Sequence, residues 1–170
     1  MLALAAPTFA QTWIETPEAK MAAARAADHA HLDMIQKWGD KELKPGQYLW
    51  DADADVSGEP RVIVSLDEQM AYFYRGTELI AVSTVSSGKP GKDTPTGIFP
   101  ILQKKPMHRS RTYNNAPMPF MQRLDDYGIA LHAGFNPGRP ASHGCVRLPE
   151  KFAAKLFRET QVGTEVLIGA

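Results

Sequence analysis

The sequence predicts a mainly β domain with one or two helices, and three observations support this fold class. Short runs rich in β-branched and aromatic residues recur between residues 47 and 105, and those between 61 and 88 are separated by turns of two or three residues. Two other stretches, 16–39 and 149–160, repeat apolar residues at three- and four-residue steps, which is the period of a helix. Everything chemically unusual lies between residues 89 and 149.

The composition is that of one soluble globular domain. At 170 residues the chain can bury a proper core but is short for two domains. Its 19 basic and 19 acidic residues cancel, so no net charge attracts it to nucleic acid or an anionic membrane. No apolar run reaches the roughly 18 residues of a transmembrane span. The single cysteine excludes an internal disulfide and any multi-cysteine zinc cluster.

The N-terminus resembles the second half of a secretory signal. It is apolar from Leu2 to Ala10, and Thr8 and Ala10 occupy the small positions before a cleavage site, although a basic n-region is missing. We interpret residues 1–10 as a signal-peptide remnant and expect a periplasmic or secreted protein. The alternative interpretation is an apolar terminus without a targeting role.

Residues 16–39 form the first expected element, a helix. Thr16 is a suitable N-cap, Pro17 suits the first helical position, and Gly39 is a typical stop. Its narrow apolar stripe predicts that residues 11–59 form an N-terminal helical arm and connector packed against a larger body. The expected stripe consists of Ala24, Ala27, His31, Met34, Ile35 and Trp38.

An acidic connector follows a short expected strand at 47–50. Asp51, Asp53 and Asp55 alternate as at the start of a calcium loop. However, Val56 and Val62 occupy the positions at which such a loop needs glycine and glutamate. We therefore interpret this connector as a solvated loop.

The centre of the chain predicts an antiparallel sheet. The runs 61–66, 70–75 and 78–88 are joined by turns too short for a parallel crossover. Residues 106–123 have no period and several prolines, which indicates a long loop or lid. Further strands are expected at 98–105, 127–134 and 164–168, and a short amphipathic helix at 149–160.

Cys145 allows three interpretations from residue chemistry alone. A lone cysteine is most often a small buried hydrophobe. A zinc site would combine it with His143, His132 and His108, but the helical His-x-x-x-His spacing is absent. A nucleophile needs a nearby histidine, which His132 or His143 supplies. It also needs oxyanion donors, and these are expected from the N–H groups around Gly144 and Cys145.

The segment "HAGFNPGRPASHGCVRLP" (132–149) resembles the active-site signature of the L,D-transpeptidase catalytic domain (YkuD) family. The resemblance covers about residues 60–169 and includes a "TPTG" loop. It implies a β-sandwich-like catalytic domain over residues 60–170, with a short helix after the active-site cysteine. The residues that match the signature are His132, Ser142, His143, Gly144, Cys145, Val146 and Arg147.

The resemblance implies a role for each of these residues. The Cys145 thiolate would attack a peptidoglycan stem peptide at the carbonyl of its third residue and expel the terminal D-alanine. His132 would be the base, with its ring oriented by the carbonyl of Ala133, and His143 would shape the loop. A thiolate at neutral pH requires a cation that lowers the thiol pKa from about 8.5. Ser142 is expected to hydrogen-bond the loop. No cofactor or metal is implied.

Several questions stay open at this stage. The two histidines are nearly exchangeable from the sequence alone. Arg147 is either a structural guanidinium or a clamp for a substrate carboxylate. Arg109 and Tyr113 on the expected lid are candidates for substrate binding. The acyl acceptor is a stem amine, an outer-membrane protein or water, the last giving an L,D-carboxypeptidase. A non-catalytic wall-binding domain and a zinc peptidase are the remaining alternatives.

Overall fold

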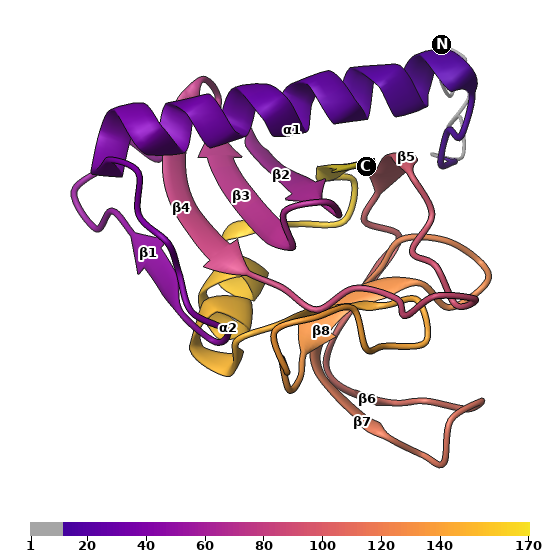
Figure 1. The fold of residues 1–170 in the computed structure, drawn as a ribbon. Helices are drawn as coiled ribbons and strands as arrows, with labels where there is room; N and C mark the ends of the chain where they lie inside the picture. Colours follow the sequence, from indigo (N-terminus) through magenta and orange to yellow (C-terminus); the bar gives the residue numbers. More distant parts are fainter. Residues whose placement is uncertain (1–11) are drawn as a thin grey trace, which may run out of the picture.

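The computed structural model describes residues 12–170, and the predicted signal remnant at 1–10 lies outside the described residues. Helices α1 (Pro17–Trp38) and α2 (Glu150–Glu159) accompany two sheets (Figure 1). The larger sheet, in spatial order, contains β1 (Tyr48–Trp50), β4 (Glu78–Thr84), β3 (Met70–Arg75), β2 (Pro60–Ser65), β10 (Glu165–Gly169) and β5 (Gly97–Pro100). The smaller sheet contains β6 (Gln103–Arg109), β7 (Pro117–Arg123), β8 (Ala130–Ala133) and β9 (Val146–Leu148).

The predicted antiparallel sheet is confirmed. Strands β2, β3 and β4 pair as consecutive hairpins, with Val62 opposite Phe73 and Tyr72 opposite Val82. The C-terminal strand β10 then pairs in parallel with β2, so the end of the chain completes the centre of the larger sheet. Its other neighbour, β5, is antiparallel.

Helix α1 lies across one face of the larger sheet, while α2 and the smaller sheet lie on the other side (Figure 1). Thr16 caps α1 by accepting the amide of Ala19, and Gly39 ends it, as predicted. Small side chains let the helix approach closely: a Cβ added to Gly169 would meet the Ala23 carbonyl oxygen at 2.7 Å. The buried stripe is rotated slightly from the expected one and consists of Ala19, Ala23, Ala27, Ala30 and Met34.

The prediction of a loop or lid at 106–123 is wrong, because most of this segment lies in β6 and β7. The prediction of one strand at 98–105 is also wrong, because β5 ends at Pro100 and β6 begins at Gln103. The chain leaves the larger sheet after β5, and β6 and β7 form a long hairpin. The prolines of this hairpin lie where each strand has a single neighbour. Pro106 is in β6, the edge strand of the smaller sheet, and Pro117 and Pro119 are in a part of β7 that pairs with β6 only, because β8 pairs with β7 only at Gln122 and Arg123.

The acidic connector is turned by its own side chains. The Asp51 and Asp55 carboxylates accept the amides of Asp53 and Ser57, and Asp51 also pairs with Lys37 at 2.7 Å. Among residues 12–170, no group of three or more His, Cys, Asp and Glu side chains gathers as a metal ion would require. Neither helix of this range has the length and apolar character needed to cross a membrane.

The packing of α1 predicts a large difference between two methionines of the same helix. Met34 is 4% exposed against the sheet, whereas Met21 is 58% exposed. We expect Met34→Ala to lower the free energy of unfolding by about 2 to 5 kcal/mol, because it leaves a cavity. Met21→Ala should change it by less than about 0.5 kcal/mol. Urea denaturation measures both, and equal effects would contradict the packing of α1 on the sheet.

Candidate active site

A cleft of about 1230 Å³ lies between the β6–β7 hairpin and the segment that contains the cysteine. Cys145, His132, His143, Arg147 and Tyr113 all line it, so tertiary structure gathers most of the expected site residues. Two expected site residues, Gly144 and Arg109, are not among the lining residues. Gly144 lies within the cysteine loop, whereas Arg109 lies on the hairpin. Its guanidinium donates to the carbonyl of Asn115 at the hairpin turn, and Arg111 lines the cleft instead.

The buried Ser142 closes the loop around the cysteine. Its hydroxyl donates to the carbonyl of Cys145 and accepts the Gly144 amide at 3.0 Å. Ser142 therefore holds the loop by hydrogen bonds, the role expected for it. Because the Gly144 N–H is already bonded to the Ser142 hydroxyl, it is not free to be an oxyanion donor.

Thr94 is a functional residue that the sequence analysis did not assign. Its hydroxyl donates to the carbonyl of Gly144 at 2.7 Å and accepts the amide of Gly88 at 2.9 Å. One buried hydroxyl thus connects the loop before β5 to the cysteine loop. Thr94 is the first residue of the "TPTG" motif, and this motif could have identified it from the sequence.

Gly144 is required by both backbone conformation and space. Its φ of +123° lies in the region that only glycine adopts readily. A Cβ there would also meet the Cδ1 atom of Ile129 at 2.7 Å. The glycine of the signature therefore fixes how closely the cysteine loop approaches the residues before β8.

His132 is held as a neutral base. It is 8% exposed at the cleft, and its Nδ1 lies 2.8 Å from the carbonyl oxygen of Ala133. A carbonyl oxygen only accepts, so Nδ1 carries the proton and Nε2 keeps a free lone pair. Burial lowers the pKa of His132, and the nearby Arg147 lowers it further, although the bond to Ala133 opposes this shift. At neutral pH the imidazole is uncharged and able to accept a proton.

The Cys145 thiol is protonated at rest. Its sulfur packs against Met118, Met121 and Ala130, and the S–H points to the carbonyl oxygen of Gly128 at 3.4 Å. Burial raises the pKa of Cys145 to about 11, even though the Ala130 amide lowers it in part. The structure therefore does not provide the preformed thiolate that a lowered pKa would give. Attack by this sulfur requires a base.

His143 has a different environment from His132. Its ring is exposed and stacks on Tyr113 at a centroid distance of 4.1 Å and an interplanar angle of 11°. Its pKa is lowered by partial desolvation and then by the charges of Lys89, Arg147 and Lys92. The hairpin turn thus rests on the cysteine loop through this aromatic pair.

Arg147 is partly explained as a structural residue. Its aliphatic stem fills the space beside Gly134, where an added Cβ would meet the Arg147 Cγ at 2.9 Å. Its Nη1 donates to the Phe135 carbonyl at 3.5 Å, a long hydrogen bond. The guanidinium also lines the cleft, so both of its expected roles have a structural basis.

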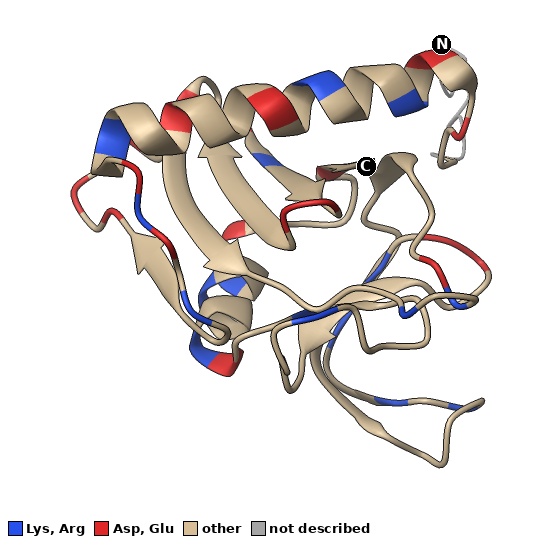
Figure 2. Ribbon diagram, viewed as in Figure 1, with Lys and Arg blue, Asp and Glu red and all other residues tan. Residues whose placement is uncertain are grey.

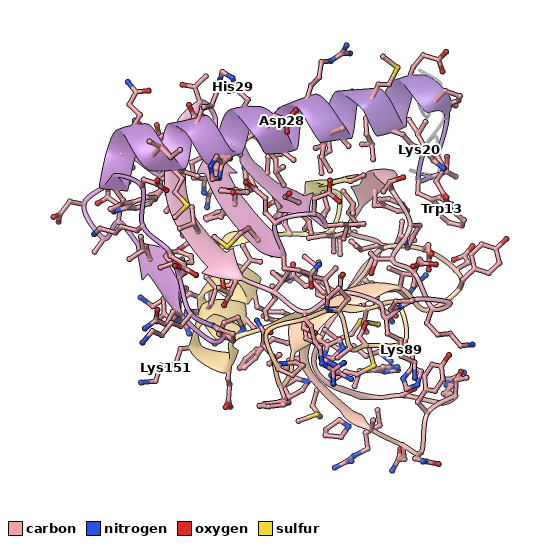
Figure 3. All side chains as sticks on the ribbon, in the orientation of Figure 1. Trp13, Lys20, Asp28, His29, Lys89 and Lys151 are labelled. Carbon is pink, nitrogen blue, oxygen red and sulfur yellow. The ribbon has the colours of Figure 1, made fainter. Side chains whose placement is uncertain are left out.

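Basic side chains outnumber acidic ones in the cleft lining, where Lys105, Arg111, Arg123 and Arg147 accompany Asp126 and Glu150. On the hairpin side, burial and then the charges of Lys105 and Arg111 lower the pKa of His108. Lys89, Lys92 and Arg147 surround His143 on the other side. Figure 2 shows Lys and Arg on the hairpin and on the loops beside β8, and Figure 3 labels Lys89 on that side of the molecule. Such a lining attracts anionic ligands.

Comparisons with known proteins point to one family. The model of the L,D-transpeptidase catalytic domain, YkuD, matches residues 59–168. "Probable L,D-transpeptidase YbiS" from Escherichia coli K12 is 29% identical over a match that covers 66% of this chain and 45% of that protein. The chain thus spans less than half of the length of this curated relative.

Solved structures show the same fold. An L,D-transpeptidase from Mycobacterium smegmatis matches with a TM-score of 0.61 at 23% identity, covering 66% of this chain and 59% of that one. An L,D-transpeptidase from Stackebrandtia nassauensis matches with a TM-score of 0.61 at 25% identity, covering 81% and 64%. The predicted fold class, including the short helix after the cysteine and the N-terminal helix, is confirmed.

The raised pKa predicts how Cys145 reacts with iodoacetamide. Only the thiolate is alkylated, so the rate should rise about tenfold per pH unit up to a midpoint near pH 11. Because Cys145 is the single cysteine, intact mass reports its alkylation directly. Glutathione, alkylated in parallel, controls for the reagent. A midpoint below that of glutathione would contradict a protonated resting thiol.

Proposed function

The chain belongs to the L,D-transpeptidase catalytic domain family, and from this premise we propose that it is a cysteine-dependent peptidoglycan L,D-transpeptidase. The observation that carries the proposal is the pair in the cleft. Cys145 presents a neutral thiol, and His132 presents a neutral imidazole with an unprotonated Nε2. This pair matches the nucleophile and general base of acyl transfer.

In the proposed first step, His132 Nε2 takes the Cys145 proton as Sγ attacks the carbonyl carbon of the third stem residue. The amide of Cys145 donates to the oxyanion that forms. The intermediate then collapses: the C–N bond to the terminal D-alanine breaks, and the imidazolium returns its proton to the departing amine. A thioester on Cys145 remains.

In the second step an amine acceptor attacks the thioester carbonyl. His132 removes a proton from the attacking amine, the C–S bond breaks, and the sulfur regains a proton to restore the thiol. A new amide bond links donor and acceptor. The acceptor is a stem-peptide amine in crosslinking or an amine of an outer-membrane protein in protein attachment. With water as acceptor, the same intermediate gives an L,D-carboxypeptidase.

His132 is favoured over His143 as the base for two reasons. The Ala133 carbonyl fixes the tautomer of His132, whereas no hydrogen-bond partner within residues 12–170 orients His143. In addition, the ring of His143 is stacked on Tyr113 and surrounded by three cations. We assign His143 and Tyr113 to the wall of the substrate cleft, and Arg147 to binding of a substrate carboxylate.

The proposed substrate also implies where the protein works. Peptidoglycan lies outside the cytoplasm, so the proposal includes export to the periplasm or beyond. In this proposal residues 60–170 form the catalytic domain and residues 11–59 supply the helix that covers its larger sheet. The packing of α1 on β2, β3, β4 and β10 supports this organisation.

Incubation with a tetrapeptide-stem muropeptide tests the reaction. Mass spectrometry should detect D-alanine release with crosslinked dimers, whereas tripeptide alone would identify the carboxypeptidase. Cys145→Ala should abolish both products, and His132→Gln should slow them about 100- to 10,000-fold, because the base is lost. The control His29→Gln changes an exposed histidine of α1 (Figure 3) and should retain activity. Full activity of Cys145→Ala would contradict a mechanism in which the Cys145 thiol is the nucleophile.

The positive lining predicts an electrostatic contribution to substrate binding. Stem peptides carry free carboxylates, so neutralising Lys105 and Arg111 together as glutamines should raise KM about 2- to 10-fold and weaken its salt dependence. Steady-state kinetics at two ionic strengths measures both effects. Lys20→Gln with Lys151→Gln removes two exposed charges elsewhere (Figure 3) and serves as the matched control. Equal KM values in the two double variants would refute this role of the cleft cations.

A further inference from the structure

A buried carboxylate lies beside the reactive thiol, and no step of the proposed reaction uses it. Asp125 is 2% exposed and lies two residues after the end of β7. Its Oδ1 accepts the amides of Tyr127 and Ile129, both at 2.9 Å. The neighbouring Arg123 donates to the Asp125 main-chain carbonyl and pairs with the carboxylate of Asp126, not with that of Asp125. The negative charge of Asp125 is therefore held by backbone amides.

The turn that Asp125 organises contacts the cysteine loop at two residues, Cys145 and Gly144. The carbonyl of Gly128 accepts the S–H of Cys145 at 3.4 Å. The side chain of Ile129 reaches the space in front of Gly144, where an added Cβ would meet its Cδ1 at 2.7 Å. The amide of Leu124 also bonds the Ile129 carbonyl at 2.8 Å, which closes the turn. Asp125 thus fixes the carbonyl to which the thiol donates.

We propose that Asp125 is a positioning residue that holds the Cys145 thiol at the Gly128 carbonyl and, through its negative charge, keeps that thiol protonated at rest. The proposal rests on the proposed function only in taking Cys145 as the nucleophile. Two features of one side chain contribute. Its hydrogen bonds shape the 125–129 turn, and its charge disfavours a second negative charge on the nearby sulfur.

Three charged or titratable groups face the thiol from the elements packed around it. Asp125 on the turn raises the Cys145 pKa, and Arg147 on β9 lowers it. His132 on β8 lines the same cleft and is neutral at rest. Burial, with Asp125 added, outweighs the Ala130 amide and Arg147, because the net shift of the Cys145 pKa is upward. The thiol therefore stays unreactive towards oxidants and electrophiles until a substrate carbonyl is in place and His132 accepts the proton.

The test separates the charge of Asp125 from its hydrogen bonds. In Asp125→Asn, an amide oxygen still accepts both backbone amides, but the negative charge is gone. We expect iodoacetamide to alkylate this variant at pH 7 several-fold faster than wild type, because loss of the Asp125 charge lowers the pKa of the Cys145 thiol. The matched control is Asp126→Asn. Its carboxylate is 73% exposed and paired with Arg123, so the alkylation rate should not change.

An alkylation rate of Asp125→Asn equal to or below that of wild type overturns the proposal, and so does equal acceleration in Asp126→Asn. If Asp125→Asn fails to fold by circular dichroism, Asp125→Ser replaces it. A serine hydroxyl accepts backbone amides in similar turns without a charge, and the same acceleration is expected. Alkylation requires no transpeptidase turnover. If Asp125→Asn is alkylated faster but the wild-type protein gives no muropeptide product, the proposed function is refuted while the role of Asp125 is supported.

Discussion

The site depends on a hydrogen-bonded junction between two segments that are far apart in the sequence. Thr94 and Gly144 are 50 residues apart, yet one hydroxyl joins them and also bonds Gly88. The backbone of Ser142 pairs with residues 87–89, and its hydroxyl closes the turn around Gly144 and Cys145. These bonds are buried, so breaking one leaves an unsatisfied polar group, which costs about 1 to 3 kcal/mol. The cysteine loop is therefore rigid.

Burial favours the neutral form of both the Cys145 thiol and the His132 imidazole. It raises the pKa of the Cys145 thiol and lowers that of the His132 imidazole, so a neutral pair is favoured over a thiolate–imidazolium ion pair. In the proposed reaction the proton is therefore transferred during the attack and not beforehand. A protonated resting thiol suits the proposed enzyme, because the sulfur is not a permanent nucleophile between turnovers.

The larger sheet supports this chemistry from a distance. Helix α1 packs on the face of the sheet away from the cleft, and the residues before it extend along β5, where Ile14 pairs with Ile98. Trp13 then meets Tyr127, an exposed aromatic residue of the 125–129 turn, edge to face at a centroid distance of 6.1 Å. Segments far apart in the sequence thus meet at the turn that holds the Cys145 thiol, and Figure 3 labels Trp13 near the end of this N-terminal segment.

The sequence by itself determined the fold class, the antiparallel hairpins β2–β3–β4, the caps of α1 and the cysteine signature. These depend on local periodicity, turn residues and capping side chains, which a single sequence displays. It did not determine the β6–β7 hairpin. Proline lacks the N–H group that a paired strand donates, so the prolines in this segment argue against strands in the sequence pattern. Three features were decided only by the tertiary structure: the protonated state of Cys145, the hydrogen bond from the Gly144 amide to the Ser142 hydroxyl, and the position of Asp125 near the thiol. Each depends on burial and on contacts between distant segments, and tertiary packing alone fixes both.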